Sequence, residues 1–584
     1  MNRKHSRHID QWNLFLHALL LLWGAAILAK LFYIQYAEGN HYRKMAQRYL
    51  KTVKVKAQRG NIYTHDDMLL AISVPKYDIY FDAVAPSDKV FYGEVDALAR
   101  RLARLKGEPY TYWRKKLREA RKKGNRYLRI ARNLSLKDYH RYANLPLFKH
   151  GQFKGGFISK MKTTREYPFG GLLRRTIGMA DDQRKFGLEG AFDKILTGTD
   201  GERLMQKIGG GTWKPVNHFY EKEPQAGKDL VTTIDMRFQD IAYHALLDQL
   251  TKYNADHGSV VIMETNTGKI RAMVNLGRTA NGRYFEKRNY AVAERYEPGS
   301  VFKAFTYLTW LEDGKAKPGD KVHLKTNRWR YLDRTITDAH AIHDEDYTVE
   351  DAFAHSSNIV TVMLTDRYYR HNPAAFVEGL ERLGVGRKTG IRLAGEVDPL
   401  LPRPGTKQWK GYKLGMMSFG YGVELTPLQI LTIYNSIANG GKRLRPLLAE
   451  AIKDGSRTVE KIEPETQDRS IADPENIAIL KKFMRKVVTD GTARNVNSPY
   501  VKIAGKTGTT QTDYWTGNTQ YIASFVGFFP YENPRYSMIV VIHKPDKSKG
   551  YYGNAVAGTV FREIAEQITG FTPDTVQIAM NAHE

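Results

Sequence analysis

Hydrophobic and polar positions divide this chain into three parts. From Trp12 to Ile34 almost every position is apolar, which is about the length that a helix needs to cross a membrane. Trp12 and Tyr33 lie near the two ends of this stretch, where amphipathic aromatic rings sit at a membrane surface. The stretch is longer than the core of a signal peptide and no small-residue cleavage site follows it, so the sequence predicts an uncleaved membrane anchor.

Residues 35–244 mix polar and apolar positions and are interrupted by glycines. The pattern predicts a helix that runs into a strand over residues 36–56 and a β-hairpin over residues 59–71. The pattern also predicts that residues 88–145 form basic helices whose charged faces lie in solvent. Asp235 predicts the N-cap of the helix that closes this part.

From about residue 245 short strands rich in β-branched residues and long apolar helices replace this pattern. The strands are predicted at residues 258–264, 269–274, 501–510, 521–529 and 537–543. The helices are predicted just after Pro298 and at residues 348–355, 426–439 and 554–568. Because strands stand at both ends of this part with helices between them, the pattern predicts one antiparallel sheet covered by helices.

The composition narrows the possible chemistry. The 584 residues include no cysteine, which excludes disulfides, thiolate metal sites and a cysteine nucleophile. The net charge is +28, and such a surface favours anionic partners such as lipid head groups, polyphosphates or nucleic acid. No helix-turn-helix, zinc-finger or RNA-binding signature accompanies the charge, so we expect no nucleic-acid partner.

One polar pair lies at the start of an otherwise apolar helix. Pro298 and Gly299 break the chain, and Ser300 and Lys303 then stand one turn apart, so that their polar ends share one face. By itself the pair is compatible with a capping serine and a lysine whose ammonium reaches solvent. The alternative is a nucleophile beside its general base, as in acyl enzymes with a Ser-x-x-Lys sequence.

Two further motifs favour the catalytic alternative. The sequence Ser-Ser-Asn at residues 356–358 follows a short predicted helix, and Lys-Thr-Gly-Thr at residues 506–509 lies in a predicted strand. Ser-x-x-Lys, Ser-x-Asn and Lys-Thr-Gly, in this order and on helix, loop and strand, resemble the motif set of penicillin-binding proteins and serine β-lactamases.

Further motifs extend the resemblance to class B penicillin-binding proteins. The segments Arg59–Ile62, Arg165–Pro168 and Gly187–Glu189 are similar to the N-terminal motifs of that class. Within the class, Asn289–Val292 and Phe419–Pro427 resemble the division-specific (FtsI-type) members, and the elongation-specific members are the nearest alternative.

Two positions depart from the usual class B pattern. Thr64–Asp66 stands where an aspartate followed by Arg and then Asn or Asp is common, which affects the details of the N-terminal domain. Val301 replaces a common threonine, and it is an apolar substitution next to the candidate nucleophile.

The resemblance implies a multidomain α+β fold with a single N-terminal transmembrane helix. An elongated pedestal domain of the dimerisation type would follow it, and then a penicillin-binding transpeptidase domain like a serine β-lactamase. The expected boundaries are residues 1–11 for a cytoplasmic tail, 12–34 for the anchor, 35–244 for the pedestal, 245–570 for the transpeptidase domain and 571–584 for a C-terminal tail.

The resemblance also implies a reaction, the cross-linking of peptidoglycan stem peptides. Ser300 would attack the D-alanyl-D-alanine end of one stem peptide and form an acyl-enzyme, which an amine of a second stem peptide would resolve. Lys303 would be the base, Ser356 would relay a proton to the leaving amine, and Asn358 would orient Lys303. No metal and no organic cofactor is expected.

The third motif would bind the substrate. Lys506 would lower the pKa of Lys303 by its charge and attract the substrate carboxylate, which Thr507 and Thr509 would hold. The backbone N–H groups of Ser300 and Thr509 would form an oxyanion hole, and the strand that contains Gly508 would pair with the peptide.

The expected partners and location follow from the same resemblance. The partners are peptidoglycan stem peptides, a lipid-linked precursor, β-lactam antibiotics, the cytoplasmic membrane, a SEDS-type glycosyltransferase and other divisome membrane proteins. The expected location is the bacterial cytoplasmic (inner) membrane at the division septum. Three further alternatives are a β-lactamase, a β-lactam sensor and a non-catalytic scaffold. A β-lactamase needs no such pedestal, a sensor needs several membrane spans, and a scaffold would not need the three motifs.

Charge argues against the expected orientation in the membrane. The flank after the anchor, residues 43–59, is more basic than residues 1–11, so the positive-inside rule would keep the large domain in the cytoplasm. Cross-linkable peptidoglycan lies outside that membrane, and long domains are translocated despite a local charge bias. We therefore expect residues 1–11 inside and residues 35–584 outside.

Overall fold

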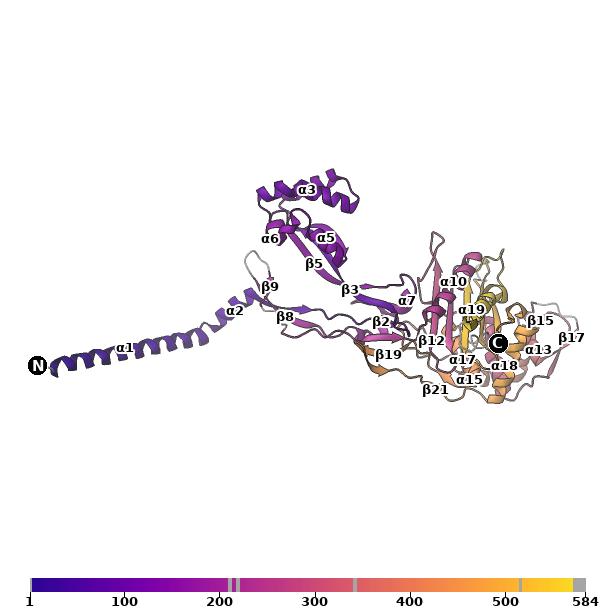
Figure 1. The fold of residues 1–584 in the computed structure, drawn as a ribbon. Coiled ribbons are helices and arrows are strands. Elements are labelled where there is room, and N and C mark those ends of the chain that lie inside the picture. Colours follow the sequence, from indigo (N-terminus) through magenta and orange to yellow (C-terminus); the bar gives the residue numbers. More distant parts are fainter. Residues whose placement is uncertain (1–2, 208–212, 217–220, 340–343, 514–516, 571–584) are drawn as a thin grey trace, which may run out of the picture. The chain divides into compact units, whose positions relative to one another are not determined.

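A computed structural model of the chain describes residues 3–207, 213–216, 221–339, 344–513 and 517–570 (Figure 1). The chain divides into two compact units, one of residues 1–59 with 197–227 and the other of residues 60–196 with 228–584. The expected C-terminal tail, residues 571–584, lies outside the described residues, as do the first two residues of the expected cytoplasmic tail.

The first unit contains the apolar N-terminal helix and a small antiparallel sheet. Within α1 (Arg3–Tyr36) the stretch Trp12–Tyr36 is suited by length and composition to cross a membrane, and none of it is buried. A helix that runs into a strand follows, as predicted for residues 36–56. The other elements, whose strands pair in the order β1–β8–β9, are α2 (Gly39–Tyr49), β1 (Leu50–Val55), β8 (Gly201–Lys207) and β9 (Trp213–Pro215).

The second unit begins with a mixed sheet centred on the long strand β3 (Leu69–Phe81). β3 forms the predicted hairpin with β2 (Ile62–Tyr63) and pairs with β4 (Leu128–Leu134) and β5 (Phe157–Glu166). The sheet continues from β2 through β10 (Asp229–Thr232), β19 (Ala449–Asp454) and β20 (Arg457–Lys461). Short elements surround it: α5 (Leu136–Ala143), η1 (Phe148–His150), α6 (Gly151–Gly155), α7 (Arg174–Ile177), β6 (Met179–Ala180), β7 (Lys185–Phe186), α8 (Gly187–Ala191) and α9 (Asp193–Leu196).

Helices α3 (Asp88–Lys106) and α4 (Tyr110–Lys122) pack with this sheet in a separate hydrophobic cluster. The prediction of helices throughout residues 88–145 is wrong at β4. There Ile130 and Ala131 are buried between exposed basic residues, and pairing with β3 gives the segment an extended backbone that its basic composition did not indicate.

The C-terminal part of the second unit is centred on a six-stranded sheet in the order β13–β12–β11–β24–β23–β22. All of its pairings are antiparallel, which confirms the predicted antiparallel sheet. Its strands are β11 (His257–Glu264), β12 (Ile270–Arg278), β13 (Tyr284–Phe285), β22 (Ala504–Thr512), β23 (Gln520–Phe529) and β24 (Tyr536–His543).

Helices cover both faces of this sheet. Successive residues of a strand point to opposite faces, so contacts of even-numbered and odd-numbered residues identify the helices on each face. A Cβ on Gly258 would meet Leu246, so even-numbered positions of β11 face α10 (Met236–Lys252), which packs with α19 (Thr559–Gly570) (Figure 1). Ser537, the partner of odd-numbered Met263, instead bonds Asn435 of α17 (Pro427–Ala438). Asp235 caps α10, as predicted.

The chain contains further elements between and around these strands. They are α11 (Tyr290–Ala293), η3 (Gly299–Phe302), α12 (Lys303–Glu312), β14 (Lys321–Leu324), β15 (Arg328–Tyr331), β16 (Arg334–Thr337), β17 (Glu345–Thr348), α13 (Val349–Ala354), α14 (Asn358–Tyr369), α15 (Pro373–Arg382), α16 (Lys413–Ser418), β18 (Arg443–Leu444), β21 (Thr466–Asp468), α18 (Pro474–Thr489), η4 (Arg494–Val496) and the π-helical turn η6 (Asn554–Gly558). The predicted helices at 348–355, 426–439 and 554–568 correspond to α13, α17 and η6 with α19.

Candidate active site

The three sequence motifs meet at one cleft. Ser300 lies in the 3₁₀ turn η3, directly before α12, in agreement with the prediction that it stands at or near the first turn of that helix. The Ser-Ser-Asn motif joins α13 to α14, and the Lys-Thr-Gly-Thr motif lies in β22. The cleft has a volume of about 300 Å³, and its walls include Ser300, Ala339, His355, Ser356, Asn358, Thr492, Thr507, Thr509, Tyr552, Gly553 and Asn554.

The second motif is a tight connection between two capped helices. Thr348 caps α13, and the Ser357 hydroxyl accepts from the Val360 N–H to cap α14. Ser356, between the two helices, has a φ of 59°, which is uncommon for a residue with a Cβ. Such backbone conformations persist where surrounding structure enforces them, and here the connection brings the Ser356 side chain to the two lysines of the other motifs.

Lys303 is buried and bonded to the second motif. Its Nζ donates to the Ser356 carbonyl at 2.6 Å, to Ser356 Oγ at 3.1 Å and to Asn358 Oδ1 at 2.7 Å. Burial lowers the pKa of Lys303 to about 7, while the negative charge of Asp338 acts in the opposite direction. The amine therefore exchanges its proton near neutral pH.

Lys506 approaches the same hydroxyl from β22. Its Nζ donates to Ser356 Oγ at 2.9 Å, so this oxygen lies between the two lysine amines. Burial and the charge of Lys303 lower the pKa of Lys506 well below its usual range. The charge of Lys303 thus disfavours the charged form of Lys506 in addition to burial, whereas for Lys303 burial is the cause that lowers the pKa.

Close backbone packing holds β22 against the turn that contains Ser300. A Cβ on Gly508 would lie 2.3 Å from Ser524 Oγ and 3.0 Å from Val301 Cγ1, so only glycine fits at this position. The Gly299 N–H donates to the Gly420 carbonyl at 3.1 Å, and the Tyr434 hydroxyl donates to the Val301 carbonyl at 2.7 Å. These contacts fix the backbone on both sides of Ser300.

The two threonines of the third motif have partners on the far wall of the cleft. Thr507 Oγ1 lies 2.8 Å from Thr492 Oγ1, and Thr509 Oγ1 accepts from the Gly553 N–H at 2.9 Å. Because β22 is the last strand in the sheet order, its outer edge is not paired with another described strand of that sheet. All eight candidate residues of the three motifs thus lie at or beside this cleft or, for Lys303, Lys506 and Gly508, directly behind it.

Sequence reasoning missed Asp338. This buried carboxylate accepts from the Ser357 hydroxyl at 2.6 Å, from the Asn358 N–H at 2.5 Å and from the Ile359 N–H at 3.2 Å. It therefore holds the second motif and the N-terminus of α14, where negative charge is favoured. Eighteen positions separate it from Ser356 and no local pattern marks it. The wall residues Thr492, Tyr552 and Asn554 also lack a sequence signal.

Two family descriptions cover most of the chain. Residues 258–566 match the penicillin binding protein transpeptidase domain, and residues 54–232 match the penicillin-binding protein dimerisation domain. The first match alone spans more than half of the 584 residues. The chain belongs to the class B penicillin-binding proteins. This confirms the resemblance that the three motifs indicated.

Curated relatives match this penicillin-binding protein over nearly its whole length. It is 28% identical over 567 residues to the probable peptidoglycan D,D-transpeptidase PenA of Neisseria gonorrhoeae, covering 94% of this chain and 91% of PenA. It is 29% identical over 576 residues to the peptidoglycan D,D-transpeptidase FtsI of Escherichia coli, covering 96% of this chain and 92% of FtsI. The penicillin-binding protein is an enzyme, a D,D-transpeptidase.

Solved structures share the fold. Penicillin binding protein 2X from Streptococcus thermophilus has a TM-score of 0.71 at 20% identity, covering 90% of this chain and 81% of that one. Penicillin binding protein 3 from Mycobacterium tuberculosis, solved with aztreonam, has a TM-score of 0.63 at 22% identity, covering 88% of this chain and 96% of that one. The predicted architecture, an apolar N-terminal helix followed by dimerisation and transpeptidase domains, is confirmed.

Proposed function

We propose that this penicillin-binding protein cross-links peptidoglycan at the division septum through an acyl-enzyme on Ser300. The observation that carries the chemistry is the position of Ser356 Oγ, at 3.1 Å from Lys303 Nζ and 2.9 Å from Lys506 Nζ, beside the cleft that Ser300 lines. One hydroxyl between two buried amines is a path along which a proton can move.

Acylation uses Lys303 as the base. Its neutral amine takes the Ser300 hydroxyl proton while Ser300 Oγ bonds to the carbonyl carbon of the penultimate D-alanine. The N–H groups of Ser300 and Thr509 stabilise the oxygen anion that forms. The C–N bond to the terminal D-alanine then breaks, and a proton passes through Ser356 Oγ to the leaving amine.

The substrate itself prepares the base. A carboxylate beside Lys506 favours the protonated form of that amine, because opposite charges attract in a buried site. The Lys506 charge then disfavours protonation of Lys303, in the same way as the Lys303 charge lowers the pKa of Lys506. Binding of an anionic peptide end therefore leaves Lys303 neutral, and Thr507 and Thr509 hold the carboxylate by hydrogen bonds.

The stem peptide binds along the outer edge of β22. An edge strand offers unpaired backbone groups to an extended peptide, and side-chain pockets supply the selectivity. The second stem peptide then brings an amine to the acyl carbon. The amine nitrogen replaces Ser300 Oγ, its proton passes through Lys303 back to Ser300, and one amide bond has been exchanged for another without a net energy source.

Similarity along the whole chain supports the septal assignment. The chain matches the relative named FtsI over 96% of its own length, and the segments Asn289–Val292 and Phe419–Pro427 resemble division-type members. Partners at that site would be the SEDS-type glycosyltransferase and other divisome membrane proteins, with β-lactams as inhibitors.

Depletion of the protein tests the septal assignment. We expect filamentous or chained cells, with the fluorescently tagged protein at mid-cell before depletion. Re-expression of the wild type should restore division, whereas Ser300→Ala should not, although it reaches mid-cell. Rounded cells with normal septa would instead support an elongation-specific enzyme and would leave the transpeptidase chemistry untouched.

A further inference from the structure

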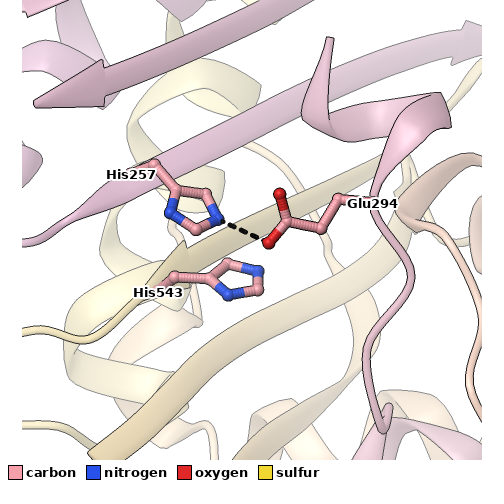
Figure 2. A group of neighbouring side chains, drawn as sticks. All are labelled: His257, Glu294 and His543. Atoms are coloured by element: carbon pink, nitrogen blue, oxygen red, sulfur yellow. Dashed lines mark ion pairs between the residues drawn. The ribbon is translucent and has the colours of Figure 1, made fainter. Parts of the chain in front are cut away.

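Among the described residues, three metal-ligating side chains come together away from the cleft (Figure 2). His257 is the first residue of β11, His543 is the last residue of β24, and the two are directly paired in the antiparallel register. Glu294 follows α11 and brings its carboxylate beside both rings. One ligand atom of each residue lies within 4.8 Å of the other two.

His257 presents a nitrogen that has no hydrogen-bond partner. Its Nδ1 lies 2.8 Å from a carboxylate oxygen of Asp256, so that Nδ1 carries the proton. Its Nε2 is buried without a hydrogen bond and lies 3.3 Å from Glu294 Oε1. In the neutral tautomer a bare lone pair and a carboxylate oxygen face each other, and a cation between them removes that repulsion.

We propose that His257, Glu294 and His543 bind a Zn²⁺ ion. Imidazole nitrogen and carboxylate oxygen are ligands that zinc accepts, with water in the fourth position. Bonds of about 2.1 Å in a tetrahedral site place two ligand atoms about 3.4 Å apart. The 3.3 Å between His257 Nε2 and Glu294 Oε1 matches this edge.

The surroundings of the two histidines fit this assignment. A histidine that binds a metal usually donates its other ring N–H to a carboxylate, and Asp256 accepts that bond from His257. Both rings are buried, which limits competition from solvent for the ion. Arg288 faces the other Glu294 oxygen at 3.4 Å and leaves Oε1 to the ion.

Binding requires one ring to turn. The His257 and His543 rings are stacked with centroids 4.1 Å apart and planes inclined by 20°, whereas a metal lies in the plane of each ring that binds it. His257 is also stacked on Tyr290, at 4.2 Å. We therefore assign the movement to His543, whose Cβ–Cγ torsion is soft and whose nitrogens have no described hydrogen bond to break.

A bound ion would tie the strand ends to the segment that leads to the nucleophile. Glu294 precedes Ser300 by six residues in the sequence. Between them, the Tyr296 ring packs edge-on against the His543 ring at 5.5 Å. The ion would thus join β11, β24 and the connection from α11 to η3 without entering the reaction itself.

Zinc titration of the full chain in detergent tests the proposal. After removal of metals with a chelator, we expect the wild type to retain one Zn²⁺ per chain at micromolar free zinc, measured by elemental mass spectrometry after gel filtration. Glu294→Gln should weaken binding by more than about tenfold. Zinc should raise the unfolding temperature of the wild type and leave that of Glu294→Gln unchanged. In chelator the two proteins should have the same unfolding temperature.

The exposed cluster of His323 with Asp344 and Asp346 supplies a matched control. His323→Asn should leave zinc stoichiometry and affinity unchanged. The wild type loaded with Co²⁺ should show the visible absorption of a four-coordinate site, which tests the proposal even if a variant fails to fold. Absence of zinc from the wild type at micromolar concentration, equal affinity in Glu294→Gln, or loss of binding in His323→Asn would each overturn the proposal.

Discussion

At the scale of single residues, burial sets the protonation of the two lysines in the site. Lys303 and Lys506 are both fully buried, and each pays for this in a lowered pKa. An exposed lysine would be protonated at neutral pH and could not act as a base. The same burial that prepares the amine also leaves Ser356 and Asn358 as its hydrogen-bond partners.

The first prediction concerns the pH dependence of acylation. Because burial lowers the pKa of Lys303 to about 7, the neutral fraction of the amine rises with pH through this value. We expect the acylation rate with a fluorescent penicillin to fall about tenfold for each pH unit below about 7 and to level off above it. Stopped-flow measurement at pH values below and above about 7 follows the acylation rate directly.

The matched variants separate the base from a general effect of a buried lysine. Lys303→Ala should slow acylation by about 10²–10⁴-fold and abolish the acid limb. Lys481→Ala removes another lysine whose pKa burial lowers, on α18, and should retain both the rate and the limb. A wild-type rate that does not change with pH across 7 would contradict the assignment of Lys303.

The second prediction assigns Asp338 as a positioning residue. Asp338→Asn removes a buried negative charge and one acceptor of the Ser357 hydroxyl or of the N–H groups of α14. Losing such a bond costs about 1–3 kcal/mol, which corresponds to about 5–150-fold in acylation rate. Because the Asp338 charge raises the pKa of Lys303, its removal should also move the acid limb to lower pH.

The control is another buried carboxylate, on the helix whose first N–H groups bond Asp338. Asp366 of α14 bonds Tyr331 and Arg370 rather than the second motif. Asp366→Asn should cost stability but leave the position of the acid limb unchanged. An unshifted limb in Asp338→Asn, with the fold intact by circular dichroism, would show that Asp338 has only a structural part.

At the scale of elements, the site depends on how closely β22 lies against the turn before α12. The sequence predicted both elements from their composition. The α12 segment is apolar over most of its length, and the β22 segment is rich in β-branched threonine. It also predicted that the motifs they contain form one site, through resemblance. It did not predict β4. The basic residues of this short segment did not indicate a strand, and its extended backbone is stabilised by pairing with β3.

The parts of the site that the sequence left open are those set by tertiary packing. Asp338 reaches the second motif from the end of β16, and Gly553 reaches Thr509 from a turn more than forty positions away. Neither position has a local periodicity or cap signal, because its role comes from contacts between distant segments. The lowered pKa of Lys506 could be expected only once burial was known.

The third prediction concerns Gly508 in β22. A Cβ there would lie 2.3 Å from Ser524 Oγ of β23 and 3.0 Å from Val301 Cγ1, so Gly508→Ala must displace the Ser524 side chain and crowd the turn that contains Ser300. We expect a loss of about 1–3 kcal/mol in stability and a larger loss in acylation, because the oxyanion hole spans the same gap. Thermal unfolding and penicillin labelling of one preparation measure both.

Two further variants identify the cause. Ser524→Ala in the Gly508→Ala background removes the closest atom and should recover part of the acylation rate. Gly319→Ala, at a glycine with open space around its Cα, should change neither quantity. Full acylation by Gly508→Ala would mean that the contact between strand and turn does not control the site.

At the scale of the whole molecule, one hydrophobic cluster of the second unit extends from the mixed sheet to the central sheet, apart from the cluster around α3 and α4. Leu70 and Leu230 of the mixed sheet belong to the same hydrophobic cluster as Val260 of the central sheet, and β19, which follows α17 in the chain, pairs with β10 in the mixed sheet. The packing therefore continues across the boundary predicted at residue 245, although the two matched domains end at 232 and begin at 258.

The fourth prediction concerns orientation in the membrane. The flank at residues 43–59 is more basic than residues 1–11, whereas the proposed reaction requires the large domain outside. We expect protease added to spheroplasts to digest residues 35–584 and to leave a small membrane-bound fragment that contains α1. A cytoplasmic protein must stay intact as the control. Full protection of the large domain would support the charge rule and remove the enzyme from its substrate.

The proposed function requires an acyl-enzyme on Ser300, and peptide mapping after incubation with a penicillin shows whether it forms there. Intact mass should rise by the mass of one penicillin per chain, and tandem mass spectrometry should place the adduct on Ser300. Ser300→Ala should take up none, while Ser357→Ala, which changes a capping serine, should still be labelled at Ser300. An adduct on another residue, or none on a folded wild-type chain, would contradict the account.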